Sequence, residues 1–263
     1  MSSLHNNELF SVKDKTVLVT GGSRGIGLMI ARTLVENGAK VYISSRKAAV
    51  CQAVAEELSK IGNCIAIPAD ISTAEGRAYL VNALKEQETG LDVLVNNAGA
   101  NWGAPFKDYP ESGYDKVMDL NVKSIFFLTQ DLLPLLLAKA SLEQPANVIN
   151  IGSIDGMRVS TLDNSAYGVS KAAVHHLTKI LAVKMQGKGI TVNAVAPGPF
   201  RSKMTESMLD AFQKQVEGVN PMKRIGMDGD MGGIVVFLAS RAGSYVNGAV
   251  IPVDGGMHLL SMV

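Results

Sequence analysis

The fold is decided by one stretch near the start of the chain, Thr16-Val17-Leu18-Val19-Thr20-Gly21-Gly22-Ser23-Arg24-Gly25-Ile26-Gly27. Its first five residues are β-branched or apolar, which predicts a strand buried on both faces, as in a parallel sheet. The glycine-rich turn follows at once, and the helical pattern after it ends at Asn37-Gly38. This order predicts a phosphate cradle, because glycines let backbone approach a phosphate and the helix N-terminus offers N–H groups. The spacing of Gly21, Gly25 and Gly27 differs from the Gly-x-Gly-x-x-Gly form.

Strand and helix patterns keep alternating to the end of the chain. Apolar runs predict further strands at 40–44, 64–67, 92–95, 147–152, 190–196 and 249–253. Helical patterns lie between them at 47–61, from 72 onward, at 120–138, from 167 onward and around 234–238. This alternation predicts an α/β fold, a single-domain (1–263), doubly wound parallel sheet of the Rossmann type with helices on both faces.

Composition excludes several classes of protein. Hydrophobic residues make up 47% of the 263 residues and charged residues 19%, so the chain can bury a sizeable core. The formal net charge of +1 gives no basic excess to attract nucleic acid or an anionic membrane. The most apolar run, 124–138, is broken by Gln130, Asp131 and Pro134, so we expect no membrane span.

Cysteine and histidine usage points to an intracellular protein without a metal. Cys51 and Cys64 form no CxxC pair, which argues against a disulfide framework or a zinc site and fits a reducing compartment. The first eleven residues carry no apolar signal segment. The four histidines show no metal-binding spacing. We therefore expect a cytoplasmic protein with no metal.

The end of the second predicted strand, Ser45-Arg46-Lys47, indicates which dinucleotide is bound. An NAD-preferring site would usually place an acidic side chain here, and this sequence has none. Arg46 and Arg24 could instead clasp a 2′-phosphate, although both could also be solvated surface cations. We therefore predict NADP(H). Asp70, after the third strand, is a candidate for the adenine edge or, alternatively, a helix cap.

A second group of residues suggests chemistry at the same edge of the sheet. Tyr167 and Lys171 are one turn apart on a predicted helix, and an ammonium beside a phenol should lower the phenol pKa. Ser153 stands at the carboxyl end of the fifth strand, where it could equally be a turn residue. Asn121 lies near the start of the helix predicted at 120–138, where it could be a cap.

Together these motifs resemble the short-chain dehydrogenase/reductase family over nearly the whole chain, from Thr20 to Gly256. The resemblance rests on Thr20-Gly21, Gly25-Ile26-Gly27, Asp70, Asn96-Asn97-Ala98-Gly99, Asn121, Ser153, Tyr167 with Lys171, and Pro197-Gly198. Within the family, Pro221-Met222-Lys223-Arg224-Ile225-Gly226, Phe237-Leu238-Ala239-Ser240 and Val253-Asp254-Gly255-Gly256 resemble the 3-oxoacyl-carrier-protein reductase branch. Asn101-Trp102-Gly103-Ala104 and 148–153 look most like its rhamnolipid-type β-ketoacyl reductases.

The resemblance implies roles for individual residues. Tyr167 would donate a proton, Ser153 would bind the reacting oxygen, Lys171 would lower the Tyr167 pKa and hold the nicotinamide ribose, and Asn121 would hold a water. The cofactor would contact Gly21, Ser23, Arg24, Gly25, Ile26, Gly27, Ser45, Arg46, Asp70, Ile71, Asn97, Ala98, Gly99, Tyr167, Lys171, Pro197, Gly198 and Ser202. Ser202 replaces the usual threonine but keeps a hydroxyl for the nicotinamide carboxamide.

The resemblance also implies a function and an assembly. It implies NADPH-dependent reduction of a ketone, with β-ketoacyl thioesters favoured, beneath a mobile lid at 200–218. The alternatives are a reductase of small or secondary-metabolite ketones and a non-catalytic NADP(H)-binding regulator. Family members usually form dimers or tetramers, here through helices near 121–138 and 167–185. Three glycines in 227–233 should weaken the start of the helix there.

Overall fold

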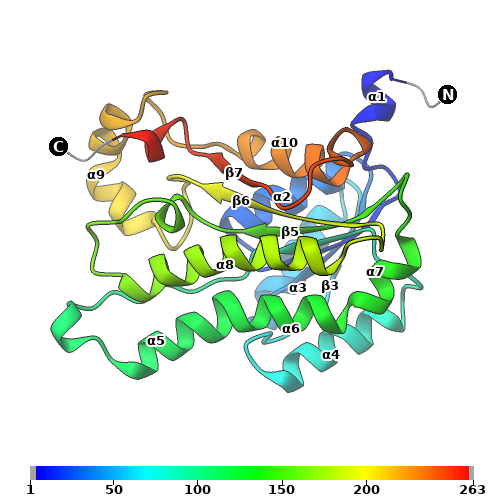
Figure 1. Cartoon of the computed structure of the whole chain (residues 1–263), viewed down its shortest axis with the longest axis horizontal. Coiled ribbons are helices and arrows are strands. Elements are labelled where there is room, and N and C mark those ends of the chain that lie inside the picture. Colours follow the sequence, from blue (N-terminus) through cyan, green and yellow to red (C-terminus); the bar gives the residue numbers. More distant parts are fainter. Residues whose placement is uncertain (1–3, 261–263) are drawn as a thin grey trace.

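The computed structural model describes residues 4–260, within which seven strands form one parallel sheet (Figure 1). The strands are β1 (Thr16–Thr20), β2 (Lys40–Ser44), β3 (Asn63–Ala66), β4 (Val93–Asn96), β5 (Ala146–Ile151), β6 (Ile190–Pro197) and β7 (Val250–Val253). Their order is β3-β2-β1-β4-β5-β6-β7. Successive strands are therefore added on one side of β1 up to β3 and on its other side from β4 onward, and β1 and β4 are parallel neighbours. The predicted doubly wound sheet is confirmed, and each predicted strand boundary lies within one residue of the observed one.

Helices cover both faces of the sheet. They are α1 (Asn6–Leu9), α2 (Gly25–Glu36), α3 (Ala48–Leu58), α4 (Ala74–Lys85), α5 (Glu111–Met118), α6 (Ser124–Asp131), α7 (Leu133–Lys139), α8 (Ser165–Lys184), α9 (Glu206–Val219) and α10 (Asp228–Ala239). Side chains alternate across a strand, so Val17 and Val19 pack with α2, α3 and α10, whereas Leu18 packs with α4, α6, α7 and α8. Two hydrophobic cores therefore enclose the sheet.

The glycines of α10 do not disrupt the helix, and our expectation of a weak helix start is wrong. A side chain at Gly232 would place its Cβ 2.1 Å from Thr33 Oγ1 of α2, so this glycine permits close packing of the two helices. Asp230 accepts a hydrogen bond from the Met227 backbone N–H and is paired with both terminal nitrogens of Arg224. These contacts compensate for the low helix propensity of glycine.

The helix predicted at 120–138 is longer and less regular than expected. It begins at Glu111, before the predicted start, and passes through a π-helical turn at Asp119–Lys123 before it continues as α6. A break at Leu132 then separates α6 from α7. A π turn depends on contacts made elsewhere in the fold, so the apolar spacing of the sequence does not reveal it.

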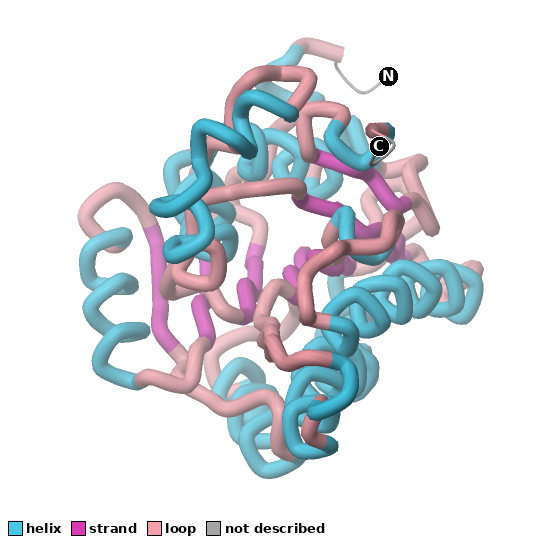
Figure 2. Tube along the Cα trace, turned by 90° about the vertical axis from the view of Figure 1, so that its left-hand side faces the viewer, coloured by secondary structure: helices cyan, strands magenta, loops and turns pink. Residues whose placement is uncertain are grey.

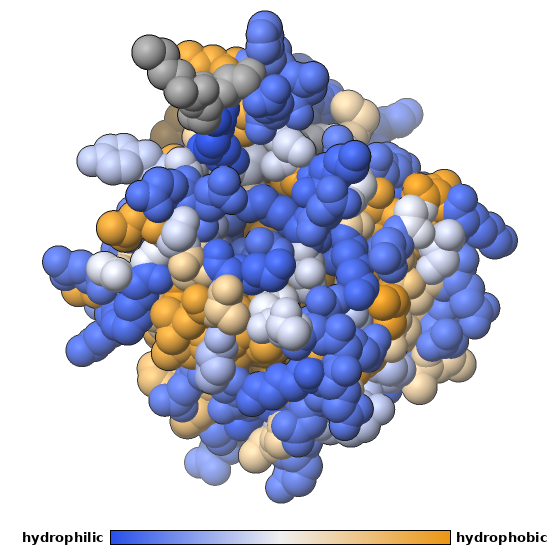
Figure 3. All heavy atoms as spheres, turned by 90° about the vertical axis from the view of Figure 1, so that its right-hand side faces the viewer, coloured by the Kyte–Doolittle hydropathy of each residue, from blue (hydrophilic) through white to orange (hydrophobic). Residues whose placement is uncertain are grey.

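The carboxyl ends of the strands in Figure 1 point to the side on which α9 lies, and Figure 2 looks from that side. Connections after the strands converge there. The opposite end, seen in Figure 3, is covered mainly by hydrophilic residues with smaller hydrophobic patches between them. Among residues 4–260, no single helix is long and apolar enough to cross a membrane. The segments Glu111–Asp131 and Leu133–Lys139, which are bent by 55° relative to each other, reach the required length and hydropathy only when they are taken together.

Candidate active site

A cleft of about 800 Å³ opens at the carboxyl ends of the strands. Its walls are the connections after β1, β2, β3, β4 and β6, the end of β5, and α8. Every residue predicted to bind the cofactor lines this cleft, and so do Ser153, Tyr167 and Lys171. The fold thus brings into one site residues that are up to 181 positions apart in the sequence, from Gly21 to Ser202.

The glycine turn after β1 is held in a conformation that requires glycine. Gly21 and Gly25 have φ angles of +65° and +53°, which side chains rarely tolerate. A Cβ on Gly27 would lie 2.3 Å from the carbonyl oxygen of Gly21, and one on Gly25 would lie 2.9 Å from Ser202 Cβ. The turn leads directly into the N-terminus of α2. The geometry is therefore that of the predicted phosphate cradle.

Polar groups gather beside this turn at the end of β2. The Ser23 and Ser45 hydroxyls are hydrogen-bonded at 2.9 Å, and Arg46 Nη1 lies 3.9 Å from Asp70 Oδ2. Ser44 also lines the cleft, and its buried hydroxyl has no hydrogen-bond partner among residues 4–260. Such an orphaned hydroxyl beside arginines fits a bound phosphate ester. The helix cap of α4 is Thr73, which accepts from Gly76 N, so Asp70 is not the cap.

The connection after β4 is fixed against the glycine turn. Thr20 Oγ1 accepts hydrogen bonds from the backbone N–H groups of Asn97 and Ala98. Asn97 Nδ2 in turn donates to the carbonyl oxygens of Thr20 and Gly21. These bonds hold 97–99 in a defined position along the floor of the cleft, next to the cradle.

Ser153, Tyr167 and Lys171 meet at the other end of the cleft. Lys171 Nζ donates to the Ile151 carbonyl oxygen at 2.8 Å and lies 5.5 Å from the centre of the Tyr167 ring. Ser153 Oγ accepts from the Asp155 N–H at 3.1 Å and is hydrogen-bonded to the Tyr167 hydroxyl. A carbonyl oxygen placed here could therefore contact two hydroxyl groups at once.

The pKa expectation for this pair is wrong. Burial raises the pKa of Tyr167 to about 12, with the Ser153 hydrogen bond opposing the shift and the Asp155 carboxylate adding to it. Burial lowers the pKa of Lys171 to about 8. Desolvation disfavours both charged forms, and the ammonium is directed to the Ile151 carbonyl instead of the phenol oxygen.

Asn121 lies behind the cleft and does not line it. It belongs to the π-helical turn, so it is not a helix cap. Its Oδ1 accepts from Ala100 N at 2.8 Å, and its Nδ2 donates to the Ala100 carbonyl and to Ser170 Oγ. The side chain thereby ties the connection after β4 to α8, on which Tyr167 and Lys171 lie. Its predicted role in holding a water stays a prediction.

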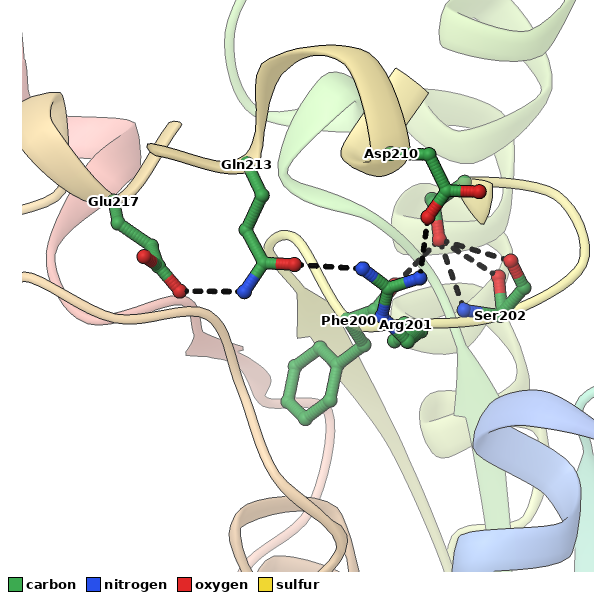
Figure 4. Close-up of polar contacts among 7 residues, drawn as sticks. Phe200, Arg201, Ser202, Asp210, Gln213 and Glu217 are labelled. Atoms are coloured by element: carbon green, nitrogen blue, oxygen red, sulfur yellow. Dashed lines mark hydrogen bonds and ion pairs between the residues drawn. The ribbon is translucent and has the colours of Figure 1, made fainter. Parts of the chain in front are cut away.

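The segment after β6 covers one side of the cleft (Figure 4). Thr205 Oγ1 donates to the Phe200 carbonyl at 2.6 Å and accepts from Ser202 N at 3.0 Å, which forms a tight turn. Figure 4 shows Arg201 bridging to α9 through Asp210 Oδ1 at 2.7 Å and Gln213 Oε1 at 2.6 Å. Helix α9 is kinked at Phe212. The segment thus begins with a tight turn and is held against α9 by polar contacts.

Sequence reasoning did not assign Lys47, Lys116 or Lys203 to the site, and all three line the cleft. Six cationic side chains of the described chain line it, against the single carboxylate of Asp70: Arg24, Arg46, Lys47, Lys116, Lys171 and Lys203. Lys116 also lies 5.1 Å from the centre of the Trp102 ring. A charged residue on a helix usually marks a solvated face, so nothing in the sequence distinguished Lys116. This lining focuses positive potential and favours anionic ligands.

The doubly wound sheet, the glycine cradle and the Ser153-Tyr167-Lys171 cluster define a dinucleotide-binding oxidoreductase of the Rossmann type. The family described as enoyl-(acyl carrier protein) reductase matches residues 21–258. The rhamnolipids biosynthesis 3-oxoacyl-[acyl-carrier-protein] reductase of Pseudomonas aeruginosa is 49% identical over 95% of this chain and 98% of its own. The FabG 3-oxoacyl-[acyl-carrier-protein] reductase of Staphylococcus aureus is 38% identical over 93% and 98%.

A solved structure gives the same result. The Pseudomonas aeruginosa RhlG/NADP active-site complex superimposes with a TM-score of 0.92 at 48% identity and covers 95% of this chain and 98% of that one. This chain belongs to the short-chain dehydrogenase/reductase family, so the resemblance noted in the sequence is confirmed.

Proposed function

We propose that this protein uses NADPH to reduce the 3-oxo group of acyl thioesters to a 3-hydroxy group. The observation that carries the proposal is the pair of hydroxyls, Ser153 and Tyr167, beside Lys171 in a cleft that also holds a phosphate cradle. The two curated relatives described above are named as 3-oxoacyl reductases and are similar to this chain over nearly its full length.

The roles of the side chains follow from their positions. Ser153 and Tyr167 bind the ketone oxygen, and Tyr167 donates its proton to that oxygen as negative charge develops there. Because its pKa is raised, Tyr167 is protonated before the hydride is transferred. Lys171 then stabilises the phenolate from one turn along α8. Asn121 keeps both helical residues in register with the cleft floor.

The cradle fits NADP(H), which supplies the hydride when it is bound. The diphosphate is held by backbone N–H groups of the turn from Gly21 to Gly27 at the N-terminus of α2. Arg24, Arg46, Ser45 and the orphaned hydroxyl of Ser44 bind the 2′-phosphate. Arg46 is held only loosely by Asp70, so it is free to turn toward a phosphate.

The substrate side of the cleft favours an apolar acyl chain. The connection after Ser153 exposes Met157, Val159 and Leu162, and Met204 of the covering segment lines the cleft. The backbone N–H of Ala104 donates to the Asp163 carbonyl, which places the exposed Phe106 segment beside that connection. We propose that residues 200–218 form a lid that closes over the acyl chain, hinged at the turn formed by Thr205.

Turnover of a carbonyl panel tests the proposal. NADPH oxidation is followed with acetoacetyl and 3-oxodecanoyl thioesters, with simple and cyclic free ketones, and with an enoyl thioester, while NADH is tested in parallel. The proposal expects turnover of the 3-oxo thioesters. Turnover of free ketones alone supports the alternative of small or secondary-metabolite ketones. Saturable NADPH binding without any turnover supports a regulator.

Assembly and location complete the proposal. We propose a homodimer or homotetramer formed through α5–α6 and α8, because these helices expose apolar side chains: Tyr114, Phe126, Phe127, Val169, Ile180 and Val183. Light scattering after size exclusion tests the assembly. The free, buried cysteines Cys51 and Cys64 support a reducing, cytoplasmic location.

A further inference from the structure

Two adjacent histidines on α8 have opposite environments. His175 is 7% exposed, whereas His176 points to solvent. His175 lies one helical turn after Lys171 and therefore follows it on the face that carries the catalytic side chains. Sequence reasoning assigned no role to either histidine, and the reaction derived above does not use them.

The His175 ring fills a slot in the connection that carries Ser153. A Cβ added to Gly152 would lie 2.2 Å from Nε2 of the ring, and one added to Gly156 would lie 2.8 Å from Cε1. Both ends of the connection are therefore glycine where the imidazole packs. The Ser153 backbone N–H is directed at Nε2 across 3.5 Å, and the Gly156 backbone is also hydrogen-bonded to the ring.

We propose that His175 is a positioning residue for Ser153, holding the 152–156 connection so that the Ser153 hydroxyl faces the phenol of Tyr167. The proposal rests on the proposed ketone reduction, because it assigns His175 an effect on that chemistry. Nε2 accepts the Ser153 N–H only when the ring is neutral with its proton on Nδ1. If Nε2 carried a proton, its N–H would face the Ser153 backbone N–H, and the repulsion between these two donors would displace the serine.

The surroundings keep the ring neutral. Burial, together with the positive charges of Lys171 and Lys179 on its own helix, lowers the pKa of His175 to about 4, while the Gly156 hydrogen bond opposes the shift. Asp155 and Arg158 are the charged groups on the connection packed against it, and the Arg158 charge acts on Asp155. The imidazole is therefore a fixed acceptor at neutral pH.

A double-mutant cycle separates positioning from bulk packing. His175→Leu keeps the ring volume approximately but removes the acceptor, and we expect kcat to fall about tenfold, the effect of one lost hydrogen bond in the transition state. On a Ser153→Ala background the same change should alter kcat by less than about twofold, because the hydroxyl that His175 positions has already been removed. An equal loss on both backgrounds would overturn the proposal.

Three controls accompany the cycle. His175→Gln supplies a neutral acceptor and should recover most of the lost kcat, whereas His176→Leu changes the exposed neighbour and should leave it unchanged. NADPH affinity should stay constant in all variants.

The pH dependence of kcat gives a further test. Wild-type kcat should fall as pH approaches about 4, and in rapid pH-jump assays the Gln variant should not show this fall.

A spectroscopic measurement keeps this proposal separate from the proposed function. Imidazole 15N shifts at neutral pH should report a His175 ring protonated on Nδ1, whichever carbonyl compound the enzyme reduces. A ring protonated on Nε2 or on both nitrogens would overturn the positioning role. Failure of every carbonyl substrate would instead contradict the ketone reduction and leave this shift unchanged.

Discussion

The two ends of the cleft are built in different ways. At the cofactor end, a side chain at Gly27 would collide with the Gly21 backbone, and one at Gly25 would collide with Ser202. At the substrate end, the connections that continue from the lining residues Ser153 and Gly103 expose apolar side chains: Phe106 is 87%, Val159 85% and Leu162 60% exposed. One end is fixed by backbone geometry, and the other depends on which side chains the connections present.

The difference predicts which parts of the site tolerate substitution and which do not. A diphosphate is recognised by N–H groups and a helix terminus, so a change in the cradle alters the whole backbone path. Exposed side chains on connections can change without disturbing the sheet, so they can be adapted to a substrate. Ser153 and Tyr167 lie at the end of the cleft away from the cradle, where the proposed reaction would take place.

The largest expected effect separates chemistry from cofactor binding. Tyr167→Phe removes the proton donor but keeps the ring, so we expect kcat to fall about 10³-fold, within the range for lost general acid catalysis. NADPH affinity, measured by fluorescence titration, should change by less than about threefold. The matched control is Tyr79→Phe, an exposed tyrosine on α4. Retained turnover would show that Tyr167 is not the proton donor.

The cradle itself gives the next largest effect. Gly27→Ala would force its Cβ against the Gly21 carbonyl at 2.3 Å, so the turn must shift. Overpacking of this kind costs about 1–3 kcal/mol, and we expect NADPH affinity to fall roughly tenfold to a hundredfold. Gly233→Ala, on an open face of α10, should leave affinity unchanged and slightly raise the melting temperature. Equal behaviour of the two variants would mean that the cradle is not under steric constraint.

A smaller effect concerns the choice of dinucleotide. Arg46→Asp replaces the proposed partner of the 2′-phosphate with a group suited to a free ribose hydroxyl. The ratio of kcat/KM for NADPH to that for NADH should fall at least about tenfold, which corresponds to 1.4 kcal/mol. Arg32→Asp, on the outer surface of α2, is the charge-matched control. An unchanged ratio would show that another group, such as Arg24 or Lys47, binds the phosphate.

The contrast between the two ends of the cleft also applies to prediction from sequence. Features set by the local backbone could be predicted, whereas features that depend on tertiary contacts could not. The strands could be predicted because each is a short apolar run between turns, and the cradle because glycine is required at Gly21 and Gly25. The raised pKa of Tyr167 could not, because it depends on burial created by distant segments. The π turn that carries Asn121 and the cleft position of Lys116 also arise from tertiary contacts and leave no local pattern.

The smallest expected effect tests whether the substrate end is set by exposed apolar side chains. The double variant Val159→Ser with Leu162→Ser removes exposed apolar side chains from the connection after Ser153 without touching the sheet. KM for 3-oxodecanoyl thioester should rise roughly threefold to tenfold, since each buried methylene contributes about 0.8 kcal/mol. KM for acetoacetyl thioester should not change, because its chain is too short to reach. Leu142→Ser, at an exposed position in the connection before β5, is the control. If both substrates lose affinity equally, the variant has disturbed the active site and not the acyl contact. If neither does, the acyl chain follows a different path, and the proposed lid at 200–218 becomes the next segment to vary.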